Sequence, residues 1–278
     1  KSYSYTIMEV KRVINNTLFK REIKSNYKIM LIFMALISMY SSVIVLMFDP
    51  KLGESLSIMA ESMPEIFAAF GMMNAGATLI EFVANYLYGF ILIVVPTICI
   101  IILGNKLIAR YVDKGSMAYL LATPNKRKNI VTTQAIFMAF AILVLVGIAV
   151  LISIGVGQIA FPGDLDIKKF LLLNVGLYGL LFFIGGMCFL SSCIFNDSRY
   201  SYGVGGGLAV VFILIQMLSQ VGDKLEKLKY LTPLTLFQPD KIIAGDSSAI
   251  VYFAVLYIIG LIMYLVGIRI FMKKDFPV

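Results

Sequence analysis

The feature of this sequence that most constrains its fold is a set of six apolar runs, each long enough to cross a membrane. A helix needs about twenty apolar residues to cross roughly 30 Å of hydrocarbon, and there it satisfies its own backbone hydrogen bonds. We therefore predict an all-α membrane protein with six transmembrane helices. The predicted spans are 29–48, 86–108, 130–159, 170–195, 201–219 and 250–268.

Composition agrees with the membrane and excludes several kinds of chemistry. The chain of 278 residues is 60% hydrophobic and 14% charged, whereas soluble domains carry about 25% charged residues. It has no His, which excludes zinc sites with His ligands and nucleophiles activated by His. Cys99, Cys188 and Cys193 lie inside apolar runs and are interpreted as small buried hydrophobes. The sequence predicts no catalytic residue and no metal ligand in this chain.

The distribution of Lys and Arg predicts the orientation of the spans. Of the 24 Lys and Arg residues, 17 lie in the two terminal segments and the two loops on the same side, including the loop 105–129. The opposite loops, 49–85, 160–169 and 220–249, hold 7, with eleven of the 16 acidic residues. By the positive-inside rule, and by the even number of spans, both termini are cytoplasmic. The net charge of +8 is thus a topology signal rather than a nucleic-acid footprint.

The chain is expected to divide into an entry segment, residues 1–28, and a six-span domain, residues 29–278. Ile7, Val10, Ile14 and Leu18 recur at helical spacing, with Lys and Arg mostly between them. This pattern predicts a basic amphipathic helix over 7–24 that lies in the membrane interface with its apolar face in lipid. No signal peptide is apparent, so the first span is expected to remain.

The spans lack the groups that couple transport to ion gradients. Lys106, close to the end of the second span, is their single Asp, Glu, Lys or Arg. Transporters driven by protons or sodium usually place carboxylates near the midplane. A pump built from these helices must therefore take its energy from outside the membrane. Otherwise the protein is a passive pore or a scaffold.

Polar and small residues within the spans allow two interpretations. The polar ones line a pathway or, as we favour, form hydrogen bonds between helices; they are Tyr88, Gln134, Asn174, Tyr178, Gln216 and Tyr257. Gly203 and Gly207 have the small-xxx-small spacing that brings helices together. The stretch 71–78 mimics a phosphate-binding loop, but Ala77 stands where that motif needs Lys. The chain itself is therefore expected to bind no ATP.

The loop 105–129 contains a short predicted helix. Asp113 or Ser116 can cap it, and Pro124 ends it. Met117, Leu120 and Leu121 fall on one face. Two turns are too short to be stable alone, so this apolar stripe either fills a groove on a partner or lies against the membrane interface.

At this loop the chain resembles the permease subunits of type-2 ABC exporters. In that family a Glu-rich step followed by Gly-Thr-Leu-Glu-x-Leu-Leu-x-Thr-Pro-x-x-Arg forms the coupling helix. The matching residues here are Gly115, Leu120, Leu121, Thr123, Pro124 and Arg127. Asp113 replaces the expected Glu, and Met117-Ala118 replaces Leu-Glu. The order of spans and loops is similar along the whole chain.

The resemblance implies a half-transporter that works with a separate ATPase subunit, which carries ATP and Mg²⁺, and with a second permease, either a copy of this chain or a related one. The coupling helix would bind the ATPase. The second and fifth spans of the family line the path, which implies a substrate path near Tyr86, Tyr88, Phe90, Phe212 and Gln216. No cofactor is expected in this chain.

The outer loops and the uncharged spans point to the cargo. Residues 63–80 predict an interfacial helix or an extension of the second span. Leu225, Leu228, Leu231 and Leu234 alternate with charges, which suggests a surface segment that caps the exit, or a stiff lid without substrate contact. A path without charge favours hydrophobic or amphipathic cargo. Exporters of bacteriocins and cytolytic peptides in the family make toxin or antimicrobial peptides the preferred cargo.

Two other functions remain open at this point. One is a non-transporting membrane scaffold or sensor partnered with an ATPase. The other is an intramembrane enzyme, for which Ser191, Ser192 or a Cys would have to act without a neighbouring base. The abundance of Ile, Lys and Asn suggests a low-GC bacterium, and hence the bacterial cytoplasmic membrane.

Overall fold

The computed structural model describes residues 14–48, 58–72, 76, 78–121, 126–221 and 225–274, which are helical without any strand. Besides the α-helices, the described chain has a π-helical turn that precedes α11 and two 3-10 turns that follow it. In order the elements are α1 (Asn16–Leu46), α3 (Pro64–Ala69), α4 (Leu79–Tyr86), α5 (Ile91–Leu107), α6 (Ala109–Asp113), α7 (Ser116–Leu121), α8 (Arg127–Ala160), α9 (Ile167–Ile194), α10 (Ser198–Ser201), η1 (Tyr202–Gly206), α11 (Gly207–Ser219), η2 (Glu226–Leu231), η3 (Pro233–Leu236), α12 (Pro239–Ala244) and α13 (Ser247–Lys273).

Six helical stretches of the described chain are long and apolar enough to cross a membrane, which confirms the predicted fold class. Most of them extend beyond the apolar runs, since a helix can continue into the headgroup region where charged side chains are solvated. The second span begins later than predicted. Tyr86 ends α4, a turn follows, and α5 starts at Ile91. Residues 63–80 contain α3 and the start of α4 rather than one extension of the second span.

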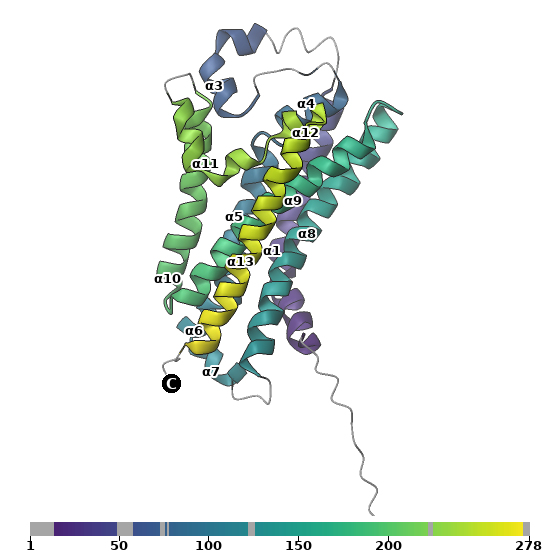
Figure 1. The fold of residues 1–278 in the computed structure, drawn as a ribbon. Coiled ribbons are helices and arrows are strands. Elements are labelled where there is room, and N and C mark those ends of the chain that lie inside the picture. The colour runs from purple at the N-terminus through teal and green to yellow at the C-terminus, as the bar shows by residue number, and fades with distance from the viewer. Residues whose placement is uncertain are drawn as a thin grey trace, which may run out of the picture.

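The start of α1 and the end of α13 lie at the same end of the molecule as α6 and α7 (Figure 1). Helices α3, α4 and α12 lie at the opposite end. An even number of spans requires this arrangement. That the end with α6 and α7 faces the cytoplasm remains the prediction from Lys and Arg. We refer to the two ends as the α7 end and the α12 end.

The predicted entry helix differs from the structure. Ile7 and Val10 lie outside the described residues, and from Asn16 the chain runs as one helix through the boundary at residue 28. Leu18 is only 5% exposed, and the ring of Phe19 packs edge-on against Phe137 of α8, with centroids 5.7 Å apart. At Leu18 and Phe19 this segment therefore packs within the protein, whereas Ile14 is 36% exposed.

Helix α9 occupies the centre of the bundle, and its glycines let α13 approach closely. A Cβ atom on Gly186 would lie 2.8 Å from the carbonyl oxygen of Gly260 on α13. Nearer the start of α9, Tyr257 Oη of α13 donates a hydrogen bond to the carbonyl oxygen of Val175, at 2.8 Å. Tyr178 Oη of α9 likewise donates to the carbonyl oxygen of Ala139 on α8, at 3.2 Å. The helix-packing interpretation of Tyr178 and Tyr257 is thus confirmed.

The close approach predicted at Gly203 and Gly207 is wrong. A Cβ atom at either position would meet nothing within 4 Å. Gly205 and Gly206 make the contacts instead: added Cβ atoms would lie 3.0 Å from Ser191 Cβ and 2.7 Å from Ile101 Cγ2, respectively. The π-helical turn η1 explains the difference, because its wider turn shifts the register of the helix face.

Adding one methyl group to α9 tests its contact with α13. Gly186→Ala should lower the free energy of unfolding by about 1–3 kcal/mol, because the new Cβ atom forces two backbones apart. Gly155→Ala on α8 is the matched control: its Cβ atom would meet nothing within 4 Å, and it should leave stability unchanged or raise it by about 0.5–1 kcal/mol. Thermal unfolding of both variants in detergent measures the difference. Equal melting temperatures would contradict the contact.

Candidate functional site

The chain folds back on itself at the α7 end through two short helices. Helix α5 breaks at Ile108, and the next backbone N–H, that of Ala109, donates to Ser192 Oγ of α9 at 2.8 Å. Gly115 has φ of +67°, a left-handed conformation that glycine adopts without strain, and it reverses the chain between α6 and α7. Ser116–Leu121 is helical, so the short helix predicted in loop 105–129 is present. We call α6 and α7 together the coupling segment.

The apolar stripe of α7 faces the protein core at Met117. Met117 is only 2% exposed, and Leu120 is half-buried against the core. Leu121 ends α7, and Pro124 lies outside the described residues. Met117 therefore anchors α7 to its own chain, which is neither of the two expected positions, a groove on a partner or the membrane interface. Among the predicted partner-binding residues, Asp113, Gly115 and Arg127 are exposed.

Arg127 joins three helix ends rather than pointing away from the bundle. Its Nη1 donates to the carbonyl oxygen of Lys274, at 3.1 Å. Lys274 Nζ in turn donates to the carbonyl oxygens of Cys193 and Ile194 at the end of α9, at 3.0 and 2.9 Å. A cation at a helix C-terminus is favourable, although burial lowers the pKa of Lys274. The beginning of α8 and the ends of α9 and α13 are thereby fixed together.

Glu22 is a polar residue at the α7 end whose role the sequence did not reveal. It is only 1% exposed and accepts three hydrogen bonds, from Tyr111 Oη at 2.9 Å, Gln134 Nε2 at 3.0 Å and Asn26 Nδ2 at 3.2 Å. The available signal was an acidic residue in a basic segment, with Asn26 four positions later on the same helix face. These bonds link α1 to α6 and α8.

A cavity of about 250 Å³ lies at the α12 end, where α4, α5, α11 and the loop 220–249 meet. We call this loop the outer loop. Tyr88 and Gln216 line it, and Phe90 lines an adjoining recess that Gln216 shares. The other two residues of the predicted path do not reach it. The ring of Tyr86 packs at a tilt against Phe82, and the backbone of Phe212 accepts a hydrogen bond from Thr232 Oγ1 at 3.1 Å. The lining residues are Ala68, Gly71, Ala84, Asn85, Tyr88, Gly89, Ile93, Gln216, Gln220, Leu234, Phe237, Pro239 and Asp240.

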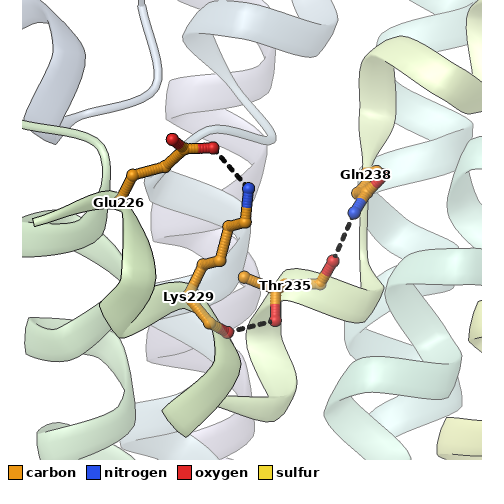
Figure 2. Close-up of polar contacts among 4 residues, drawn as sticks. All are labelled: Glu226, Lys229, Thr235 and Gln238. Carbon is orange, nitrogen blue, oxygen red and sulfur yellow. Dashed lines mark hydrogen bonds and ion pairs between the residues drawn. The ribbon is translucent and has the colours of Figure 1, made fainter. Parts of the chain in front are cut away.

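The outer loop forms one wall of this cavity, and its own hydrogen bonds hold it in place (Figure 2). Thr235 Oγ1 donates to the carbonyl oxygen of Lys229, and Gln238 Nε2 donates to the carbonyl oxygen of Thr235, both at 2.8 Å. The Glu226–Lys229 ion pair is exposed and adds little. Of the alternating leucines, Leu234 is 2% exposed and faces the cavity, whereas Leu231 is 62% exposed.

The cavity carries a charge that the uncharged spans did not predict. Asp240, in the first turn of α12, is one of its lining residues. Partial burial raises the pKa of this carboxyl group, and the nearby Glu81 raises it further. Asn85, Gln216 and Gln220 add amide groups. This carboxylate comes from α12, in the loop 220–249, rather than from a span.

The sequence itself decides the family. Residues 18–276 match the family of ABC-2 family transporter proteins. The chain belongs to the ABC-2 transporter family. Members of this family form the membrane component of transport and usually work with an ATPase subunit. Comparison with curated protein sequences gave no match. The ABC-2 family and the six apolar helices together make this chain a multi-pass membrane protein.

Asp240 and Asp246, at the two ends of the turn that contains α12, should respond to pH in opposite directions. The raised pKa of Asp240 means that its charged form costs stability. Asp240→Asn should therefore raise the melting temperature at pH 7 by about 1 °C after solvent screening. This gain should vanish as the pH falls towards the ordinary aspartate value of 3.8.

Asp246 provides the matched control for this prediction. Its carboxylate accepts the backbone N–H of Ser248 at 2.9 Å, which lowers its pKa. Asp246→Asn should therefore lower the melting temperature at pH 7, and the loss should shrink in acid. Melting curves between pH 4 and pH 7 measure both variants. A stabilising Asp246→Asn or a destabilising Asp240→Asn would contradict the assignment.

Proposed function

We propose that this chain is the permease subunit of an ATP-driven exporter. In this proposal the chain forms the translocation path, a second permease completes it, and a separate ATPase binds the coupling segment from the cytoplasm. The observation that carries the proposal is a pair of short helices, α6 and α7, at the end where α1 begins and α13 ends. Met117 anchors the inner face of this pair in the bundle.

The proposed energy source follows from what the membrane-spanning segments contain. Their apolar centres hold no Asp or Glu. Glu22 lies in the first long helix, near the α7 end, and its oxygens already accept hydrogen bonds from Tyr111, Gln134 and Asn26. A carboxylate engaged in this way is not open for a coupling ion. Energy from ATP, hydrolysed in another subunit, is therefore the economical source.

The contacts of the coupling segment provide a route for mechanical force. Met117 fixes α7 in the core, and the Ala109–Ser192 hydrogen bond ties α6 to α9. Helix α9 packs closely on α13 at Gly186 and Gly260. Because packed cores are stiff, a push on the exposed side of α6 and α7 would move α9 and α13 with it.

Helix α11 supports the proposed second permease. The apolar window of its span is only 22% buried in the chain, and Leu208, Val211 and Leu214 are exposed. On α5, Ile98 is 46% exposed. Lipid can cover such surfaces as well as protein can, so the pairing across α5 and α11 rests on the two-permease arrangement of the type-2 exporters that the chain resembles.

The cavity at the α12 end supports an amphipathic cargo. Tyr88, Ile93 and Phe237 give it apolar walls, and Asp240 with the amides gives it a polar side. Hydrophobic or amphipathic peptides with a cationic group fit both parts. Peptides of the toxin or antimicrobial type remain our preferred cargo, by resemblance to exporters of this architecture.

The alternative functions make less use of these features. A scaffold or ATPase-linked sensor needs the coupling segment but no cavity, and it would move no labelled peptide into inverted vesicles. An intramembrane enzyme would need a free nucleophile. Ser191 Oγ donates to the carbonyl oxygen of Ser201, and Ser192 Oγ accepts from Ala109, so both hydroxyl groups serve the structure.

Charge reversal on the exposed side of the coupling segment tests the proposed docking. Asp113→Lys should weaken association with the ATPase by about tenfold, because a reversed charge at an interface repels its former partner. Asp164→Lys makes the same change on an exposed residue of the opposite loop and should have no effect. Co-purification of the ATPase with each tagged variant measures the loss. Equal recovery with both variants would contradict docking at this segment.

A second pair of changes tests the anchoring of α7. Leu120→Asp combined with Leu121→Asp should abolish the association, since it places a charge where Leu120 packs against the core and so releases the helix. Full ATPase recovery with this double variant, while it remains folded by size-exclusion chromatography, would count against α7 as the docking helix.

A further inference from the structure

The α7 end holds a second pocket, distinct from the cavity at the α12 end. Its volume is about 360 Å³, and it lies where α1, the end of α5 and the coupling segment meet. Four cationic side chains line it, Arg21, Lys106, Arg110 and Lys114, together with the single carboxylate of Glu22. The pocket therefore has a strong excess of positive charge.

This positive charge is not neutralised within the described chain. The ion pair found among the described residues joins Glu226 and Lys229, so none of the four cations has a carboxylate oxygen within 4 Å. Glu22 supplies one negative charge against four cations, so an excess of positive charge remains in the pocket. Arg21 is oriented by the ring of Tyr111, 5.8 Å from its centroid. Clustered cations without a counter-charge attract an anion.

The pocket lies close to the level of the lipid headgroups. On α1, Arg21 and Ser25 line the pocket, and Leu31 and Ile32 further along are 54% and 59% exposed. At 1.5 Å per residue, the pocket begins about 9–15 Å from this lipid-facing surface. Basic pockets between transmembrane helices on the cytoplasmic side bind anionic lipid headgroups.

We propose that this pocket binds the phosphate group of an anionic phospholipid from the adjacent leaflet. Arg110 and Lys114, on the coupling segment, supply two of the cations. Ser116, the first residue of α7, also lines the pocket, so a bound headgroup contacts the segment that the ATPase is proposed to push. The assignment does not depend on the proposed transport function, because it rests on the pocket alone.

Binding to the full-length chain in detergent tests the assignment. Dioctanoyl phosphatidylglycerol, dioctanoyl phosphatidylcholine and inorganic phosphate are the probes, and the dissociation constant is measured by thermophoresis. The wild-type chain should bind phosphatidylglycerol in preference to the other two. Arg110→Gln with Lys114→Gln should weaken that binding about 30-fold, which corresponds to about 1 kcal/mol for each cation removed.

The matched control removes two exposed lysines from the opposite loop. Lys168→Gln with Lys169→Gln loses the same charge and should bind phosphatidylglycerol like the wild type. Lys114→Gln alone should give an intermediate loss, which keeps the test informative if the double variant does not fold.

Four results would overturn the proposal. The first is unchanged phosphatidylglycerol binding in the Arg110 and Lys114 double variant. The second is equal weakening in the lysine control, which would indicate a general charge effect. The third is inorganic phosphate binding as tightly as the lipid, which would make a free phosphate the ligand. The fourth is loss of ATPase co-purification by the Arg110 and Lys114 double variant while its phosphatidylglycerol binding stays unchanged, which would assign the pocket to an acidic partner surface.

Discussion

The rest of this structure depends on the cost of placing charge in hydrocarbon. Ionisable side chains are expensive at the centre of a bilayer, and this chain keeps them at the two ends of its helices. The α7 end has Glu22 and a cationic pocket, and the α12 end has Asp240 in an amide-rich cavity. The apolar segments between them carry no Asp or Glu. In the proposed exporter, the spans would transmit movement between the two charged ends.

Close packing around α9 gives the spans a way to transmit movement. Small residues allow α13 to contact α9 backbone to backbone at Gly186, and the hydrogen bond from Ala109 to Ser192 connects α9 with the coupling segment. At the α7 end, the Lys274 side chain caps the C-terminus of α9 by donating hydrogen bonds to its last carbonyl oxygens. A membrane protein has little hydrophobic drive between helices, so these contacts and hydrogen bonds hold the bundle together.

Periodicity and length made the fold predictable, whereas the site depended on contacts between distant segments. The six spans follow from apolar length, and helix Ser116–Leu121 follows from its apolar spacing. The spacing places Met117 on the apolar face but does not say what covers that face. In the structure the Met117 side chain is buried in its own chain. The partners of Glu22 on α6 and α8 lie 89 and 112 residues away, so no local pattern could reveal them.

Two further features could not be predicted from the sequence: the helix register around η1 and the position of Asp240 in its loop. The π-helical turn moved the close contacts from Gly203 and Gly207 to Gly205 and Gly206, which a regular helical period does not anticipate. Asp240 reaches the cavity because α12 folds back over α4. A count of charges by loop cannot place such a side chain.

The central claim is that energy for transport comes through the coupling segment and not from an ion gradient. Uptake of a labelled cationic amphipathic peptide into inverted vesicles that contain the permease and its ATPase tests this most directly. The account predicts that uptake continues when ionophores collapse the proton and sodium gradients, and stops when ATP is replaced by a non-hydrolysable analogue. Uptake that stops with the gradients and continues without ATP hydrolysis would contradict it.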